Sequence, residues 1–358
     1  MEDLNYQEDN QVTEQPIEQK EVLPQWFPFS RIGVFFVSLL AGTNLIAMII
    51  MSAMLIHVSI VATLTQGSAL DMNAITQTAS DMMTRNTVWV MIAAYAITIP
   101  LCMLIVKGVP KYKNEQKEKW GVSKLLLFFM LSVGLMMFGN IVSVVARGLV
   151  TLITGHQMTN PLDSILNADN ILGSLVLVVI VAPFVEEFLF RKVLIDRVRV
   201  YGDKVAILLS GILFGVFHGN IFQVVYATLL GMILAYVYLK TSKILYCIGL
   251  HMAINIIGGA LPLLLMRGAD MNISSGESLS QLENIPIQSL ALGMIGLIEL
   301  GCMIATIVLF VIYYKKIKLT PGAIEIAKEQ RFKTIYLNVG MVLFFILCAI
   351  IFIMNAIA

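Results

Sequence analysis

The chain has 358 residues, of which 58% are hydrophobic and only 13% charged, and its formal net charge is +1. Its mean hydropathy of +0.85 lies far above that of a soluble globular domain, so the composition excludes that class and predicts a polytopic membrane protein. The nearly balanced charge gives no basic footprint for nucleic acid, and we expect no nucleic-acid partner.

The chain opens with an acidic segment of about thirty residues. This segment contains one basic residue, Lys20, and seven acidic residues, namely Glu2, Asp3, Glu8, Asp9, Glu14, Glu18 and Glu21. The segment has three prolines and too little apolar content to fold alone, so residues 1–30 are predicted to be disordered or to lie on a surface. It lacks the basic start and short apolar core of a cleavable signal, so the first apolar run should stay in the mature protein.

Apolar runs that can cross a bilayer follow this segment. A spanning helix needs about 20 residues, and eight runs meet that length. They lie at about 32–58, 87–106, 125–153, 171–194, 222–239, 244–266, 290–314 and 335–357. A shorter run at 205–218 makes nine helices. The predicted fold is therefore all-α, a polytopic transmembrane bundle of about eight to nine transmembrane helices in the lipid bilayer.

Four parts of the chain can be distinguished. They are the N-terminal tail at 1–30, N-terminal transmembrane helices at 31–153, a catalytic membrane core at 154–266, and a C-terminal loop with transmembrane helices at 267–358.

Basic residues are concentrated in alternate loops. Lysines and arginines gather in 107–124, 197–204, 240–243 and 315–333, whereas the loops near 65–86, 154–170 and 267–289 hold very few. The positive-inside rule then places the N-terminus in the cytoplasm and the C-terminus outside. We interpret the 107–124 loop as a solvated helical face near the lipid headgroups, and the outer loops show no chemistry.

Several single polar residues are interpreted as structural. Cys102, Cys247, Cys302 and Cys348 each stand alone in an apolar run and are expected to act as small buried hydrophobes. His57 and His156 have no neighbouring acid and are taken as structural too. Arg147 lies inside an apolar run, where an arginine must pair or snorkel, but the sequence identifies no partner for it.

The stretch from Val181 to Lys192 places two adjacent carboxylates, Glu186 and Glu187, at the end of an apolar run. A carboxylate in a hydrocarbon segment is costly, so it indicates function by default. On a helix Glu187 can pair with Arg191 four residues later, whereas Glu186 has only apolar neighbours at that spacing. The alternative interpretation is that both acids simply end the helix at the membrane surface.

Two histidines occur in the same third of the chain. His218 ends the short run, and His251 and Asn255 share one helix face because four residues separate them. If the fourth helix continues to a turn at 201–204, Glu187 and His218 each lie about fifteen residues, or ~23 Å, from that turn. The polar groups are therefore expected to converge, although a lone histidine in an apolar run is often only a packing residue.

This set of side chains is sufficient for hydrolysis. A glutamate and a histidine can deprotonate a water molecule, and a second histidine with an asparagine amide can stabilise an oxyanion. A catalytic zinc ion is an alternative, with Glu186, His218 and His251 as its ligands. The sequence has no His-Glu-x-x-His helix, no Gly-x-Ser-x-Gly elbow, no cysteine nucleophile beside a histidine, and no paired intramembrane aspartates.

Three motifs then carry a resemblance to a known family. They are Glu186-Glu187-x-x-x-Arg191, Phe214-x-x-x-His218 and His251-x-x-x-Asn255, in this order. Together they resemble the CPBP family, the Abi-like CAAX-processing and bacteriocin-processing intramembrane proteases, over about residues 171–260. The resemblance implies that Glu186 activates water with the help of His218. It also implies that Glu187 and Arg191 hold the helix, and that His251 and Asn255 form the oxyanion site.

The resemblance implies an endopeptidase whose substrate is a membrane-embedded or membrane-tethered protein or peptide. Prenylated C-terminal tails, peptide leaders and bacteriocin immunity are all open, and the core looks like that of bacterial members in the plasma membrane. A non-enzymatic immunity or scaffold protein and a proton-coupled transporter remain as alternatives. A transporter often shows internal repeats, and the single Glu-Glu segment has no second copy.

We expect a metal-free site, since Glu187 is engaged by Arg191 and no spare acid is left to orient a ligand.

Overall fold

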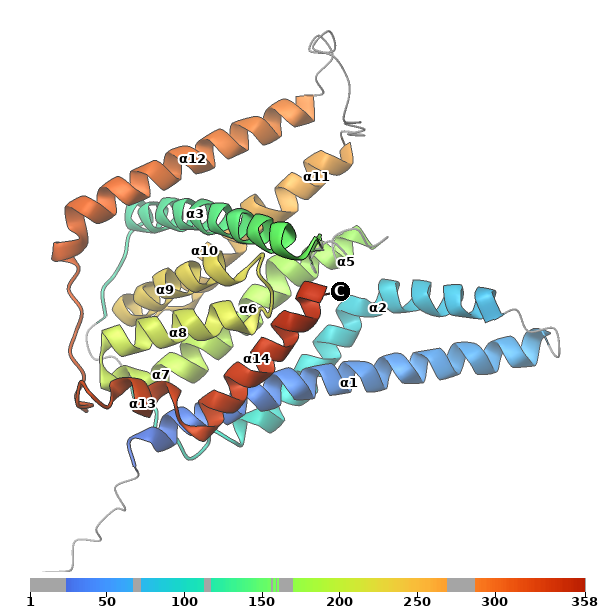
Figure 1. The fold of residues 1–358 in the computed structure, drawn as a ribbon, viewed down its shortest axis with the longest axis horizontal. Coiled ribbons are helices and arrows are strands. Elements are labelled where there is room, and N and C mark those ends of the chain that lie inside the picture. The colour runs from blue at the N-terminus through green and yellow to red at the C-terminus, as the bar shows by residue number, and fades with distance from the viewer. Residues whose placement is uncertain are drawn as a thin grey trace, which may run out of the picture.

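The computed structural model describes residues 24–66, 72–112, 117–155, 157, 158, 160, 170–268 and 287–357. These ranges consist of helices joined by turns, which confirms the all-α fold (Figure 1). The helices are α1 Trp26–Gln66, α2 Met72–Met103, α3 Val122–Thr154, α5 Ile171–Val176, α6 Ala182–Glu187, α7 Asp196–Val198, α8 Asp203–Phe217, α9 Val224–Thr241, α10 Ile244–Asn255, α11 Leu261–Gly268, α12 Ile287–Tyr313, α13 Arg331–Tyr336 and α14 Val339–Ile357.

In the described part of the chain eight helices are long and apolar enough to cross a membrane, so the chain is a multi-pass membrane protein. One of them runs from Ile171 to Tyr201 and joins α5, α6 and α7 through π-helical turns at Leu177–Val181 and Phe188–Ile195. We call it the Glu-pair helix. A third π-helical turn, Ile256–Ala260, joins α10 to α11. Such turns are rare and frequently mark functional sites, and here they flank the acidic pair and follow Asn255.

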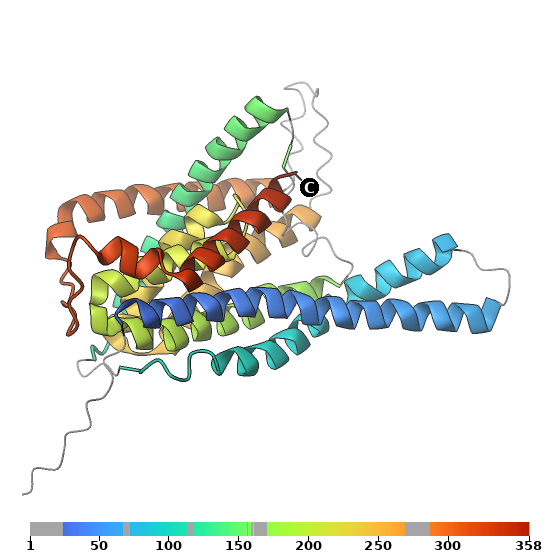
Figure 2. The same cartoon turned by 60° about the horizontal axis from the view of Figure 1, so that its bottom comes forward.

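The centre of the bundle is the closely packed pair of α8 and α9, which lies beside the Glu-pair helix. Helix α3 packs on α9, α12 covers α3, and α1 packs on both α2 and α14. The far ends of α1 and α2 extend beyond the rest of the bundle (Figures 1 and 2). At 41 residues α1 is about 60 Å long, roughly twice the thickness of a bilayer's hydrocarbon core.

Aromatic rings connect the first helix to the predicted site. Phe36 of α1 stacks on Phe190 of the Glu-pair helix, with their ring centroids 4.9 Å apart, and Phe190 meets Phe214 of α8 edge to face at 5.0 Å. Phe214 in turn contacts the rings of both His218 and His251. Because edge-to-face and stacked pairs stabilise beyond the area they bury, this row helps to hold α1, the Glu-pair helix and α8 against the two histidines.

The structure corrects two expectations about the first hundred residues. The predicted tail, residues 1–30, extends too far along the chain, because α1 already begins at Trp26 and Phe29 is fully buried against Tyr201. Residues 1–23 lie outside the described ranges. The predicted outer loop at 65–86 is mostly helix, because α1 reaches Gln66 and α2 begins at Met72. There Ile75 and Ala79 pack on Val58, which compensates for the weak helix propensity of the polar residues.

The basic loop at 107–124 is not the helical face that we expected. Its described part is turn and irregular chain that ends at Gly121, before α3, as Gly108 and Pro110 favour. The loop bonds to the core instead: the Tyr112 amide donates to the Asp196 carbonyl at 2.7 Å, and the Glu118 amide to the Lys240 carbonyl at 2.8 Å. Hydrogen bonds from Lys124 and Trp120 hold the pKa of Glu118 below its usual value.

The predicted turn at 201–204 is confirmed, and a later segment of the chain covers it. Gly202 has a φ of +99° between the Glu-pair helix and α8. The Asp203 amide donates to the Thr320 carbonyl at 3.0 Å, and the Thr320 amide donates back to the Asp203 carboxylate at 2.9 Å. Lys240 also pairs with Asp203 at 2.9 Å. The charge of Asp203, at the tip of the hairpin between the Glu-pair helix and α8, is therefore bound by groups of the protein itself.

The cysteines are free thiols, and Cys102, Cys247 and Cys348 are buried as predicted, whereas Cys302 is partly exposed. His57 lies on the exposed surface of α1, and His156 lies outside the described residues.

Helices α1 and α14 approach closely at two glycines, Gly33 and Gly340. A Cβ at Gly340 would overlap the Ser30 carbonyl. We predict that Gly340→Ala forces the helices apart, costs about 1–3 kcal/mol as other overpacked sites do, and lowers the thermal midpoint in detergent. The control is Gly296→Ala on α12, where no atom lies within 4 Å of the added methyl group. Equal midpoints for the two variants would contradict this close packing.

Candidate active site

A fully buried ion pair forms the base of the site. Glu187 and Arg191 lie one turn apart on the Glu-pair helix and are each 0% exposed. The Arg191 Nε donates to Glu187 Oε2 at 2.7 Å, and a terminal nitrogen of the same guanidinium donates to Oε1 at 3.3 Å. The other terminal nitrogen donates to the Ser210 hydroxyl of α8. The pair predicted from the four-residue spacing is present, and it also ties the Glu-pair helix to α8.

His251 of α10 lies against both acids. Its Nδ1 is 3.0 Å from Glu187 Oε1, within hydrogen-bond distance, and its Nε2 is 3.7 Å from Glu186 Oε2. The second separation is too long for a direct hydrogen bond. When Nδ1 donates its proton to Glu187, the Nε2 lone pair faces Glu186, so the two groups can share a proton or a water molecule between them.

Glu186 is the uncommitted acid of the pair. The Glu186 side chain is 17% exposed, whereas that of Glu187 is fully buried. In the described residues the shortest ion-pair contact of Glu186 is the 3.7 Å approach of His251. Tyr95 of α2 and Tyr226 of α9 both lie within electrostatic range of the carboxylate. The asymmetry that the sequence predicted, one locked acid and one available acid, therefore matches the geometry.

His218 caps the end of α8, and its orientation is set by a backbone carbonyl. Its Nδ1 is 2.8 Å from the Phe214 carbonyl oxygen. The imidazole lies edge-on to the Phe214 ring, with the centroids 5.0 Å apart, and His251 contacts the same ring at 5.6 Å. The two histidines thus flank one phenylalanine. Within the described residues His251 approaches Glu186 at 3.7 Å, and the role that the resemblance implies for His218 beside Glu186 stays a prediction.

Asn255 lies one turn beyond His251 on α10. Its amide nitrogen donates to the Val178 carbonyl at 2.8 Å, within the π-helical turn before the acidic pair. This bond uses one of the two amide protons and leaves the other for a ligand. The convergence of Asn255 and His218 with Glu186 on a common point within ~10 Å stays a prediction, whereas the two acids, Arg191 and His251 form one contiguous network.

Several polar residues of this region were not predicted from the sequence. Ser210 binds Arg191 from across the hairpin, and only the equal-depth estimate for the two helices could have pointed to it. Tyr95 comes from a helix distant in sequence, and nothing in its surroundings marks it. The unassigned Arg147 has its guanidinium 4.3 Å from the centroid of the Phe222 ring, a cation–π contact.

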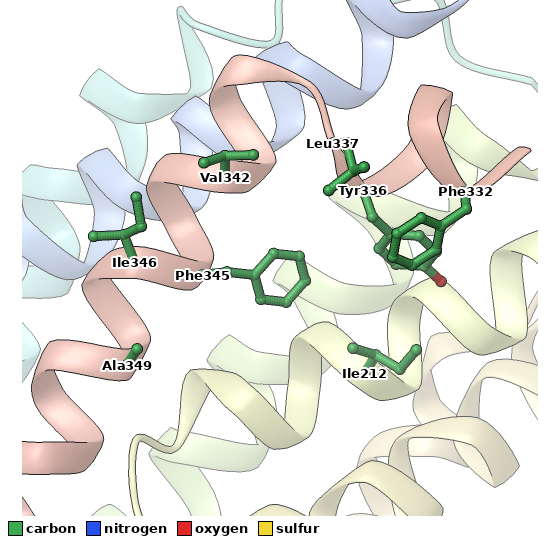
Figure 3. A pocket seen from close by; sticks show the side chains of 8 residues that line it. All are labelled: Ile212, Phe332, Tyr336, Leu337, Val342, Phe345, Ile346 and Ala349. Atoms are coloured by element: carbon green, nitrogen blue, oxygen red, sulfur yellow. The ribbon is translucent and has the colours of Figure 1, made fainter. Parts of the chain in front are cut away.

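An apolar cavity of about 290 Å³ lies beside the acidic pair. It is bounded by α2 through Tyr95 and Pro100, and by the Glu-pair helix through Val181 and Val185. A second groove, of about 500 Å³, lies between α8 and the α13–α14 corner, where Figure 3 shows apolar side chains facing one space. Neither lining contains a carboxylate or an imidazole, but Val185 in the wall of the first directly precedes Glu186 in the chain.

The orientation of the two histidines corrects part of our zinc argument. We expected no spare acid to orient a ligand, but Glu187 binds Arg191 and His251 at once. With Nδ1 held by Glu187 or by the Phe214 carbonyl, each Nε2 is oriented as in a metal site. Among the described residues, however, no three His, Cys, Asp or Glu side chains form a group able to hold a metal ion.

Comparison with known proteins gives one match. Residues 168–257 match the family model described as Type II CAAX prenyl endopeptidase Rce1-like. The match spans about a quarter of the chain and contains all six predicted site residues, so the resemblance is confirmed for this segment. Searches of curated proteins and of solved structures found no match.

We predict that Arg191→Ala destabilises the fold by roughly 3–5 kcal/mol, because it leaves the Glu187 charge buried without its partner. The double variant Glu187→Gln with Arg191→Ala should recover part of this loss, since it removes the unpaired charge as well. Unfolding of purified protein in detergent measures both effects. A normal melting temperature for Arg191→Ala alone would show that the pair does not hold the helix.

The metal prediction has its own test. We expect the purified protein to contain no stoichiometric zinc by elemental analysis and to withstand chelation. About one zinc per chain, lost together with activity on chelation and regained on adding it back, would instead make Glu186, His218 and His251 ligands.

Proposed function

We propose that this chain, whose residues 168–257 form an Rce1-like domain of the CAAX protease family, is an intramembrane endopeptidase. Its substrate is a membrane-embedded or membrane-tethered protein or peptide, and the reaction is hydrolysis of a peptide bond by a water molecule that Glu186 activates. The observation that carries the proposal is the pair of unequal acids: Glu187 is locked by Arg191 and His251, whereas Glu186 is partly exposed beside His251.

In the proposed reaction Glu186 accepts a proton from the water, whose oxygen bonds to the scissile carbonyl carbon. The electrons of the carbonyl bond move to its oxygen, where hydrogen-bond donors stabilise the negative charge. When the intermediate collapses, the nitrogen leaves as an amine and takes the proton from Glu186. His251, fixed through Nδ1 by Glu187, presents Nε2 to the same water and keeps Glu186 oriented.

The cavity between α2 and the Glu-pair helix supports entry of an apolar substrate. Its wall contains Val185, which directly precedes Glu186, and Tyr95, which lies within range of the carboxylate. A substrate segment that passes from lipid into this space keeps its apolar side chains out of water while its backbone reaches the acid.

The arrangement of the basic loops supports the proposed orientation, with the N-terminus in the cytoplasm of a bacterial cell and the protein in the plasma membrane. The four basic segments meet at one end of the bundle. The loop at 107–124 bonds to Asp196 and Lys240, and the segment after α12 bonds to Asp203. A single end rich in lysine and arginine is what the positive-inside rule requires of a cytoplasmic face.

We expect Glu186→Gln to abolish cleavage while the protein folds normally, because glutamine cannot accept the proton of the water molecule. The assay reconstitutes purified protein in liposomes with a pool of single-span and C-terminally lipidated peptides, and mass spectrometry identifies the products. The matched control is Glu299→Gln, which removes a partly buried acid from α12, outside the matched segment. Cleavage by the Glu186→Gln variant at the rate of the unsubstituted protein would rule out the mechanism.

A further inference from the structure

The turn after His218 holds a chain of side-chain hydrogen bonds that the mechanism above does not use. Asn220 accepts from the Gln223 amide at 3.0 Å and donates to the Gln223 side-chain oxygen at 2.7 Å. Its amide also donates to the His218 carbonyl at 2.9 Å. Gln223 therefore has both its backbone and its side chain fixed where α9 begins.

Gln223 in turn orients the hydroxyl of Tyr226, which lies on the first turn of α9. Its side-chain nitrogen donates to the Tyr226 hydroxyl oxygen at 2.9 Å. A phenol can accept one hydrogen bond and donate another, so the Tyr226 proton stays available. Within the described ranges that proton has no acceptor.

Two observations place this available donor at the site. Hydrogen bonds connect the Tyr226 hydroxyl through Gln223 and Asn220 to the carbonyl of His218, and the rings of His218 and His251 contact the same phenylalanine. The charge of Glu186 also acts on the Tyr226 phenol, which agrees with this placement. On its other side, α3 approaches so closely that a Cβ at Gly139 would overlap the backbone of Tyr226. The backbone of Tyr226 is therefore fixed by α3 and its hydroxyl by Gln223, beside the acid that we propose as the general base.

The two groups expected to form the oxyanion site are each partly engaged. Asn255 donates one amide proton to Val178, and His251 has Nδ1 at Glu187 and Nε2 toward Glu186. A further donor would complete the site. A tyrosine hydroxyl, whose pKa in water is about 10, is a better donor to an oxyanion than an amide, which is far less acidic.

We propose that the Tyr226 hydroxyl is a catalytic residue that donates a hydrogen bond to the scissile carbonyl oxygen of the substrate. The inference rests on the proposed endopeptidase function and adds a role outside the three motifs of the resemblance. The bond strengthens as negative charge develops on that oxygen, and the proton stays on the phenol throughout. Gln223 acts as a positioning residue, since it binds Asn220 and the hydroxyl that it orients and has no role toward the substrate.

The decisive variant is Tyr226→Phe, which keeps the ring and removes only the donor. Loss of one oxyanion donor lowers kcat by about 100-fold to 1,000-fold, and we expect a loss of this size with little change in KM. The matched control is Tyr236→Phe on the same helix, where the ring stacks on Phe128 at 5.7 Å, away from the acids, and kcat should be unchanged.

A second variant tests the orientation by Gln223. Gln223→Met keeps the length of the side chain but cannot bond to the hydroxyl, so we expect a smaller loss of kcat. The double variant with Tyr226→Phe should be no worse than Tyr226→Phe alone, because both act through one hydrogen bond.

Each further outcome decides the inference. If the unsubstituted protein cleaves peptides and Glu186→Gln does not, a normal kcat for Tyr226→Phe overturns the role of Tyr226 alone. Should Tyr226→Phe raise the acidic limb of the kcat/KM profile at unchanged maximal rate, the hydroxyl donates to Glu186 and the proposal is wrong. No cleavage by the unsubstituted protein, with peptide and liposomes verified, overturns the endopeptidase function and this inference together.

Discussion

The buried pair of Glu187 and Arg191 is the constraint on which the site depends. A carboxylate and a guanidinium with no exposure must satisfy their hydrogen bonds inside the protein, because an unpaired charge there is strongly destabilising. The pair does so with two further partners, Ser210 on α8 and His251 on α10. Three helices are thus held at one depth by charge and hydrogen bonding, in a membrane where apolar packing alone specifies the depth of a helix poorly.

The exposure of Glu186 follows from the burial of its neighbour Glu187. Two consecutive residues on a helix point about 100° apart, so when Glu187 turns toward Arg191, Glu186 points in another direction, where it is partly exposed beside His251 of α10. The π-helical turns on both sides of α6 change this rotation locally, and Pro183 removes one backbone donor within the same stretch. The helix that contains the acids is therefore irregular where the proposed chemistry needs one carboxylate free and the other fixed.

The sequence predicted what depends on local spacing and failed where helices meet. Four residues between Glu187 and Arg191 are sufficient to predict their pair, and the turn at Gly202 fixed the depth of the hairpin. The rotation of α8 and α10 about their axes decides whether His218 or His251 reaches Glu186, and no local pattern encodes it. Tyr95 and Ser210 were missed for the same reason. The helix before Arg85 was missed because its polar residues are stabilised by tertiary contacts with Val58.

The contact between Asp203 and Thr320 links the hairpin tip to the order in which the chain is made. Synthesis proceeds from the N-terminus, so the acids and both histidines emerge well before the segment that closes over the tip. After the span formed by α10 and α11, one more membrane span, α12, must be inserted before Thr320 can reach Asp203. The chain can therefore complete this end of its hairpin only after most of the bundle has been inserted into the bilayer, which delays the finished site until late in biogenesis.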